Sequence, residues 1–99
     1  MSKFTFKILW LENNIAIAID YNIGNNKSPL TSYFFWPRND AWEELKIELE
    51  SKPWINKNEK VDLLNKTTEI INFWQEKEKN TSLRKAKEKF PEFNFIGTN

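Results

Sequence analysis

Residues 4–21 read FTFKILWLENNIAIAIDY, and large apolar side chains recur at every second position along most of this stretch. Residues 4–11 and 15–21 each repeat with a period of two and are rich in aromatic and β-branched side chains, which is typical of β-strands. Between them lie Glu12, Asn13 and Asn14, and Asn tolerates the left-handed backbone of a tight turn. The stretch therefore predicts a β-hairpin, with Phe4, Phe6, Ile8 and Trp10 on one face of its first strand and Leu9 and Leu11 on the other.

The residues after the hairpin predict a loop and then a short third strand. Residues 22–32 contain Gly24 and Pro29 among several Asn and Ser residues, which break any regular period. Residues 33–36 read YFFW and form a short apolar run. Proline cannot donate a hydrogen bond to a sheet, so this strand must end at Pro37 or lie at an edge.

Two helices are predicted from their capping residues. Asp40 and Glu43 have the spacing of a capping box, and the sequence Ser-Lys-Pro at 51–53 ends the first helix. Asn56 and Glu59 have the same spacing and start a second helix, which the pattern extends to about residue 79. The predicted core-facing residues are Trp42, Leu45 and Leu49 in the first helix and Leu63, Leu64, Thr67, Ile70, Ile71 and Trp74 in the second.

The predicted fold is a small two-layer α+β domain. A β-hairpin plus a short third strand packs against two helices, with a basic C-terminal tail. Residues 1–79 form the predicted core domain, and residues 80–99 form a basic C-terminal extension with a helix at 83–90 and a short aromatic tail at 92–99. Ile47 and Phe73 fall on the polar sides of the two helices, where they are either isolated surface residues or a protein contact.

The composition argues against catalysis. The 99 residues include no Cys and no His, which excludes disulfides, thiolate catalysis and Cys/His zinc sites and removes the commonest general base. Gly24 and Gly97 are the only glycines, so there is no glycine-rich phosphate loop. We therefore expect no catalytic residue, no metal, no cofactor and no small-molecule substrate. No apolar stretch reaches the ~18 residues of a membrane span, so no membrane contact is expected.

Two groups of residues are candidates for contact with RNA or protein. The net charge is +1, so any RNA contact must use a local patch. Residues 83–89 read LRKAKEK, and Arg84, Lys85 and Lys87 either contact phosphates or belong to a solvated tail. Trp36, Pro37 and Arg38 form the second group, because Arg38 lies on a stiff turn and its guanidinium can hold phosphate or carboxylate. The alternative for Arg38 is a salt bridge to Asp40 or Glu43.

The five Trp residues are either core residues or platforms for unpaired bases. Positions in the predicted helices and strands favour the core for Trp10, Trp42 and Trp74. Trp36 and Trp54 lie at element ends, and both interpretations stay open for them. The second face of the hairpin is half apolar and could admit a partner; its residues are Leu9, Leu11, Ala16 and Ala18.

Residues 27–55, KSPLTSYFFWPRNDAWEELKIELESKPWI, resemble the core of the third plastid-specific ribosomal protein family of the small ribosomal subunit. Residues 6–20 and 61–76 look like the start and end of that family, whereas residues 77–99 do not match it. The resemblance implies a structural protein of chloroplast or cyanobacterial ribosomes, with small-subunit rRNA and neighbouring ribosomal proteins as partners and the plastid stroma as its location. It gives no enzymatic residue to transfer.

The Lys-rich composition and a start unlike an Arg/Ser-rich transit peptide fit a plastid-encoded protein. Two other functions stay open at this point. One is a regulatory or assembly factor that binds the ribosome transiently, and the other is an interaction module of the photosynthetic machinery with no RNA contact.

Overall fold

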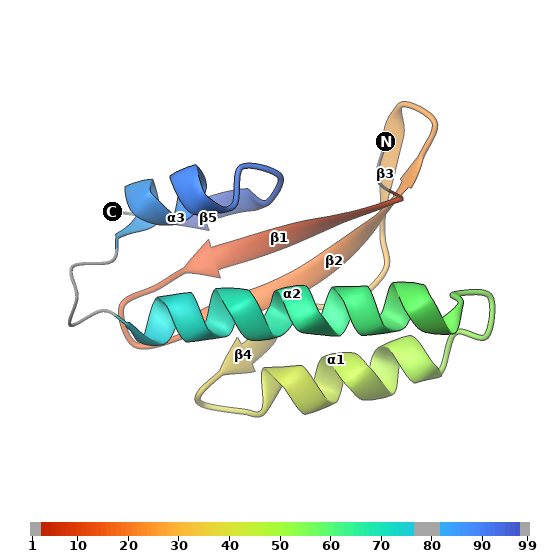
Figure 1. Ribbon diagram of the computed structural model, residues 1–99, viewed down its shortest axis with the longest axis horizontal. Coiled ribbons are helices and arrows are strands. Elements are labelled where there is room, and N and C mark those ends of the chain that lie inside the picture. Colours follow the sequence, from red (N-terminus) through yellow and green to blue (C-terminus); the bar gives the residue numbers. More distant parts are fainter. Residues whose placement is uncertain (1–2, 77–81, 98–99) are drawn as a thin grey trace.

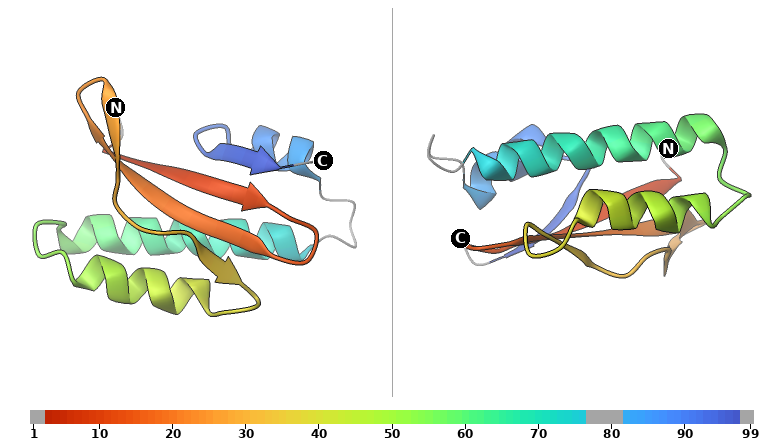
Figure 2. Two further views of the ribbon diagram at one scale, coloured as in Figure 1. Left: turned by 180° about the vertical axis from the view of Figure 1, so that it is seen from behind. Right: turned by 90° about the horizontal axis from the view of Figure 1, so that it is seen from below.

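A computed structural model describes residues 3–76 and 82–97 (Figure 1). Along these residues the chain forms β1 (Phe4–Trp10), β2 (Ile15–Ile23), β3 (Asn26–Pro29), β4 (Phe34–Trp36), α1 (Ala41–Glu50), α2 (Lys57–Gln75), α3 (Leu83–Lys89) and β5 (Asn94–Gly97). The strands make one sheet in the order β3–β2–β1–β5, and β4 also pairs with β2. The right-hand view of Figure 2 shows α1, α2 and α3 on one side of this sheet. The predicted α+β class is confirmed.

The predicted hairpin is confirmed as β1 and β2. The two strands are antiparallel, and their register runs from Phe4 opposite Tyr21 to Trp10 opposite Ile15. This register places Ile8 opposite Ile17, so the large apolar side chains of both strands share the face that the helices cover. A hydrogen bond from Leu11 N to Asn14 O, 3.1 Å long, closes the turn between them.

The prediction of a loop at residues 22–32 is wrong for residues 22–23, which extend β2, and for residues 26–29, which form β3. Gly24 has a φ of 58°, a left-handed conformation that lets the chain turn back on β2. β3 has exposed residues only and pairs with β2 from Asp20–Pro29 to Ile23–Asn26. It carries no apolar alternation, so nothing in its sequence marks it as a strand.

The third predicted strand is confirmed as β4, which is antiparallel to β2 with Phe35 opposite Ala16. The chain reaches it through Leu30 and Thr31, whose backbone N–H groups both donate to Ile19 O. The Thr31 hydroxyl oxygen accepts a hydrogen bond from Ile19 N at 3.1 Å. The strand ends before Pro37, as expected, and the Trp36–Pro37 peptide bond is cis.

Both predicted helix starts are confirmed by their hydrogen bonds. The Asp40 carboxylate accepts from Glu43 N at 3.1 Å, and α1 begins at Ala41. Asn56 and Glu59 form a capping box, in which Glu59 N donates to Asn56 Oδ1 at 2.8 Å and Asn56 N donates to Glu59 Oε1 at 3.2 Å. α2 ends at Gln75, short of the predicted end at about residue 79, because Glu76 is already its C-cap.

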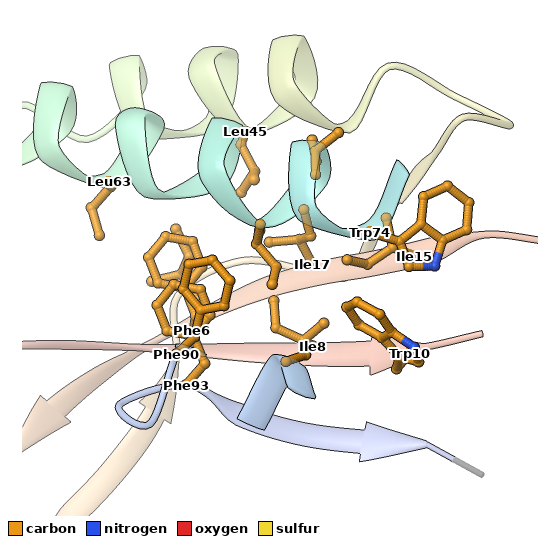
Figure 3. Packing of buried hydrophobic residues seen from close by; sticks show 14 of the residues in the cluster. Phe6, Ile8, Trp10, Ile15, Ile17, Leu45, Leu63, Trp74, Phe90 and Phe93 are labelled. Atoms are coloured by element: carbon orange, nitrogen blue, oxygen red, sulfur yellow. The ribbon is translucent and has the colours of Figure 1, made fainter. Parts of the chain in front are cut away.

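The core lies between the helices and the covered face of the sheet (Figure 3). Trp10 and Trp74 are buried in it, as predicted. Trp42 is half-buried at its edge, since Ala41, Leu45 and Leu49 are the residues of α1 that are fully covered. The indole N–H of Trp42 donates to Leu64 O at 3.3 Å. Of the two Trp residues left open, Trp36 packs partly against the core and Trp54 is 55% exposed.

Residues 82–97 fold back onto the domain, an arrangement that the sequence pattern did not predict. α3 contributes Leu83 and Ala86 to the core, and Phe90 and Phe93 follow. β5 is parallel to β1, from Lys7 opposite Asn94 to Trp10 opposite Gly97. The predicted boundary between residues 79 and 80 lies outside the described residues and stays a prediction.

The C-terminal segment also explains Phe73, which was predicted on a polar helix face. Its ring lies 6.2 Å from the Trp10 ring and 5.7 Å from the Phe90 ring, measured between centroids. α3 and the residues after it therefore cover a side of α2 that its own periodicity marks as polar. Ile47, the other apolar residue on a polar face, is 58% exposed.

Candidate nucleic-acid interface

The predicted contact residues fall into two groups on opposite sides of the central hairpin. Trp36 is the last residue of β4, which pairs with β2, and Pro37 and Arg38 follow it. Arg84, Lys85 and Lys87 lie on α3, which leads into β5, and β5 pairs with β1. Figure 2 shows the C-terminal segment and the β4–α1 turn at different edges of the sheet. The two groups do not form one patch.

The cations of α3 are exposed on a helix whose other side is buried. Ser82 caps the helix by accepting from Lys85 N at 3.3 Å, and Leu83 and Ala86 dock it on the core. Arg84, Lys85 and Lys87 point outward as exposed residues, and none of them forms a salt bridge with another described residue. The docked helix therefore fixes the backbone positions of three exposed cations that form no ion pair with the described residues.

Arg38 stacks on an aromatic ring and forms no ion pair with any described residue. Its Cζ atom lies 4.3 Å from the centroid of the Phe35 ring, and its backbone N–H donates to Asn14 Oδ1 at 3.3 Å. The alternative of a salt bridge to Asp40 or Glu43 is wrong, because neither carboxylate is within ion-pair distance among the described residues and Asp40 caps α1 instead. An exposed guanidinium beside a ring keeps its side-chain N–H donors available.

Trp36 lies on the other face of the sheet from Phe35. It pairs with Ile15 of the covered face and packs against the core, whereas Phe35 pairs with Ala16. Adjacent residues of a strand point to opposite faces, so Arg38 and Trp36 are not neighbours on one surface. Pro37 is exposed between them. Side chains alternate between the two faces of a strand, so Tyr33 and Phe35 share a face that Trp36 does not. This alternation was the sequence signal that could have identified Phe35 as the partner of Arg38.

Trp36 lines a shallow pocket of about 220 Å³ on the helix side, together with Trp42, Thr68, Ile71, Asn72 and Gln75. The indole Nε1 of Trp36 is buried and has no hydrogen-bond partner among residues 3–76 and 82–97. The pocket is open and has no charged lining residue. It offers apolar contact, without the pair of titratable groups that acid–base chemistry requires.

The shifted pKa values belong to one ion pair that includes none of the candidate contact residues. The hydrogen bond and the charge of Glu59 raise the pKa of Lys3, and the hydrogen bond with Lys3 holds the pKa of the Glu59 carboxyl below its usual value. Nowhere in the described part of the chain do three or more carboxylates gather as metal ligands. None of its helices is both long enough and apolar enough to cross a membrane.

Comparison with known proteins gives the class as ribosomal protein. A family model described as "Plastid and cyanobacterial ribosomal protein (PSRP-3 / Ycf65)" matches residues 30–77. The chain is 54% identical over 99 residues to the "Probable small ribosomal subunit protein cS23" of Synechococcus sp. (strain JA-2-3B'a(2-13)), covering 100% of this chain and 99% of that protein.

Two further relatives have the same name. The "Small ribosomal subunit protein cS23" of Euglena viridis is 54% identical over 101 residues, covering 98% of both chains. That of Mesostigma viride is 55% identical over 91 residues, covering 92% of this chain and 74% of its own length. The chain belongs to this family of plastid and cyanobacterial ribosomal proteins, which are structural proteins and not enzymes, and the expected family is confirmed.

Proposed function

We propose that the chain is a structural constituent of the small ribosomal subunit of plastids, located in the stroma, where it bridges rRNA and neighbouring ribosomal proteins. One observation carries the proposal. The identity to proteins named as small-subunit components is 54% and extends over 98% or more of both chains. Identity at this level over the whole domain includes the surface residues as well as the core, so a shared binding role follows from it more directly than from the fold alone.

The α3 cations supply the contact with the rRNA backbone. Arg84, Lys85 and Lys87 are exposed, unpaired among the described residues and fixed by the docking of Leu83 and Ala86. Cations of this kind bind phosphates and position a protein without reading the base sequence. A near-neutral chain can bind RNA in this way, since only the local patch enters the field of the nucleic acid.

The outer side of α1 suits a protein neighbour and does not suit RNA. Four of its ten residues are carboxylates, at Glu43, Glu44, Glu48 and Glu50. Like charges repel phosphate, so this side is expected to face solvent or a basic ribosomal protein. Ile47, 58% exposed among these acids, gives such a neighbour an apolar contact. An acidic side and a cationic side on one small domain are what a bridging protein requires.

Co-sedimentation of purified protein with small ribosomal subunits, measured across a salt series, tests the proposal. The test variant replaces Arg84, Lys85 and Lys87 by Gln. The matched control replaces Lys46, Lys57 and Lys60, on α1 and α2, by Gln and removes the same charge. We expect the α3 variant to bind more weakly and to lose about two units of the log–log salt slope, because each phosphate contact contributes ~0.7–0.9.

The control should keep the wild-type slope within error. If the α3 variant and the control bind alike at every salt concentration, α3 is not the rRNA contact. If the wild-type chain itself does not co-sediment with small subunits, the proposed function is wrong.

A further inference from the structure

The side of the sheet away from the helices is open over the described part of the chain (Figure 2). The strand register places a defined set of side chains there. They include Thr5, Lys7 and Leu9 of β1, Ala16, Ala18 and Asp20 of β2, and Phe35 of β4, and we call this set, with Tyr33 and Arg38, the open face. Tyr33 belongs to it because Lys7 Nζ lies 5.4 Å from the centroid of its ring. Asn94 and Ile96 of β5, opposite Lys7 and Leu9, continue the open face at the sheet edge.

The open face contains two aromatic rings, each with a cation beside it. Arg38 lies over Phe35 at 4.3 Å and Lys7 lies over Tyr33 at 5.4 Å, measured to the ring centroids. The two rings are two residues apart in extended chain, which separates them by about 7 Å along the strand. The Arg38 guanidinium covers one face of the Phe35 ring and offers its own outer plane to a planar group.

The residues beneath the rings are small and completely covered. Ala16 lies opposite Phe35 in the register, and both Ala16 and Ala18 have 0% exposure on a face that no described helix covers. Neighbouring long side chains must therefore lie across them. The side chains that lie across the two alanines are half-exposed and form a flat surface without a groove. They are Phe35, Tyr33 and Leu9.

The charges of the open face favour RNA over protein. Its one carboxylate, Asp20, is buried and pairs with Lys7 at 3.1 Å between Nζ and Oδ1. Arg38 has no carboxylate partner among the described residues. A protein packed on these rings would bury Lys7 and Arg38 as well, at a desolvation cost. A nucleotide strand offsets this cost, since its bases stack on the rings and on the guanidinium and its phosphates lie beside Arg38.

We infer that the open face binds a single-stranded segment of RNA, whose unpaired bases stack on Tyr33, Phe35 and the Arg38 guanidinium. The inference rests on the proposed function, because it states that the small-subunit RNA at this site is unpaired. Aromatic rings and guanidinium planes stack on any base, so the contact is selective for unpaired over duplex RNA and not for sequence.

Fluorescence anisotropy tests the inference with two probes, a short single-stranded oligouridine RNA and an RNA duplex of the same length. The variants are Phe35→Leu, which removes a ring, and Arg38→Lys, which keeps the charge but removes the planar fork. Trp54→Leu is the matched aromatic control, since Trp54 is 55% exposed and its ring meets Tyr21 of the covered face. Lys46→Ala is the matched cation–π control, since Lys46 Nζ lies 5.9 Å from the Trp42 ring on the helix side.

We expect Phe35→Leu to weaken binding of the single-stranded probe about tenfold, the usual order for loss of one base stack. Arg38→Lys should weaken it by a smaller factor and leave binding of the duplex unchanged. Both controls should bind the single-stranded probe within about twofold of wild type. Because Arg38 is exposed, Arg38→Lys keeps the test valid even where Phe35→Leu lowers stability.

The inference is overturned if both test variants bind the single-stranded probe as the controls do. It is also overturned if they bind that probe normally but co-sediment poorly with small subunits, since the open face would then contact a protein. One outcome would overturn this inference and leave the proposed function intact. In it, the wild type and both open-face variants co-sediment normally with small subunits, and the α3 variant does not.

Discussion

Trp74 links the last turn of α2 to the turn of the first hairpin. Its indole N–H donates to Leu11 O at 3.0 Å, and the residue is 4% exposed. The bond joins residues far apart in sequence, so its loss frees both elements. The ring also fills core volume beside Ile15 and Trp10 (Figure 3).

Replacing Trp74 by Ala should lower the free energy of unfolding by about 3–5 kcal/mol, the usual cost of truncating a buried aromatic residue. Trp54→Ala is the matched control and should cost about 1 kcal/mol, mostly from its ring contact with Tyr21. Urea denaturation followed by circular dichroism measures both. Equal losses in the two variants would mean that Trp74 is not a core residue.

Trp36 differs from Trp74 in its hydrogen bonding, because its buried Nε1 has no partner among the described residues. A buried donor without a partner costs free energy, and replacing it by an apolar group is close to neutral or stabilising. Trp36→Phe should therefore change the unfolding free energy by less than about 1 kcal/mol, whereas Trp74→Phe should lose the bond to Leu11. Denaturation curves of the two variants measure both changes in unfolding free energy. A larger loss at position 36 would show that the Trp36 N–H has a partner.

At the scale of elements, the start of α2 combines a cap with an ion pair. Glu59 completes the capping box with Asn56 and accepts from Lys3 Nζ at 2.9 Å, which ties the helix to the residue before β1. The hydrogen bond with Lys3 lowers the pKa of Glu59 in the folded state. A lowered carboxyl pKa contributes stability above the unfolded pKa, and this contribution is lost as pH falls through the folded pKa.

Glu59→Gln should therefore reduce stability at neutral pH and leave stability at pH below the folded pKa nearly unchanged. The effect is small, because both groups are exposed and the pair is screened by salt. Thermal melts of wild type and variant between neutral and acidic pH measure the difference. The expectation fails if the two melting temperatures differ by the same amount at every pH.

The C-terminal elements bear on the domain boundary predicted at residue 79. Phe93 stacks on Phe6 with 4.7 Å between centroids and on Phe90 with 5.1 Å, and β5 extends the sheet beside β1. A chain truncated after residue 79 would lose these contacts and expose Phe6 and Trp10. It should unfold at lower denaturant than the full chain and bind a hydrophobic dye. Unchanged denaturation would instead establish residues 1–79 as an independent domain.

Local sequence patterns predicted the strands and helices whose own residues carry a periodic or capping signal. Alternation predicted β1 and β2, and capping residues predicted the starts of α1 and α2. β3 was missed because its pairing with β2 depends on backbone bonds and the turn at Gly24. β5 and the docking of α3 were missed because their partners, such as Phe6 and Trp10, lie more than half the chain away. The candidate cations were found from sequence, but the ring beneath Arg38 was not, since only the register separates Phe35 from Trp36.

At the scale of the whole molecule, a net charge of +1 conceals an uneven distribution. The carboxylates of α1 and the cations of α3 both lie on the helix side, but at different edges of the sheet, whereas Arg38 lies on the open face. The β4–β2–β1–β5 pairing keeps α1 and α3 apart on a domain with principal extents of 39 × 28 × 20 Å. The separation lets a protein of this size contact two kinds of neighbour in one particle.

An electron-microscopy map of a small ribosomal subunit that contains this chain tests the central claim most directly. The account predicts density for the chain in one place at full occupancy. It predicts the α3 cations within hydrogen-bond distance of rRNA phosphate oxygens and the carboxylates of α1 turned away from RNA. Partial occupancy on translating ribosomes, or a chain bound to rRNA through α1 with α3 in solvent, would contradict it.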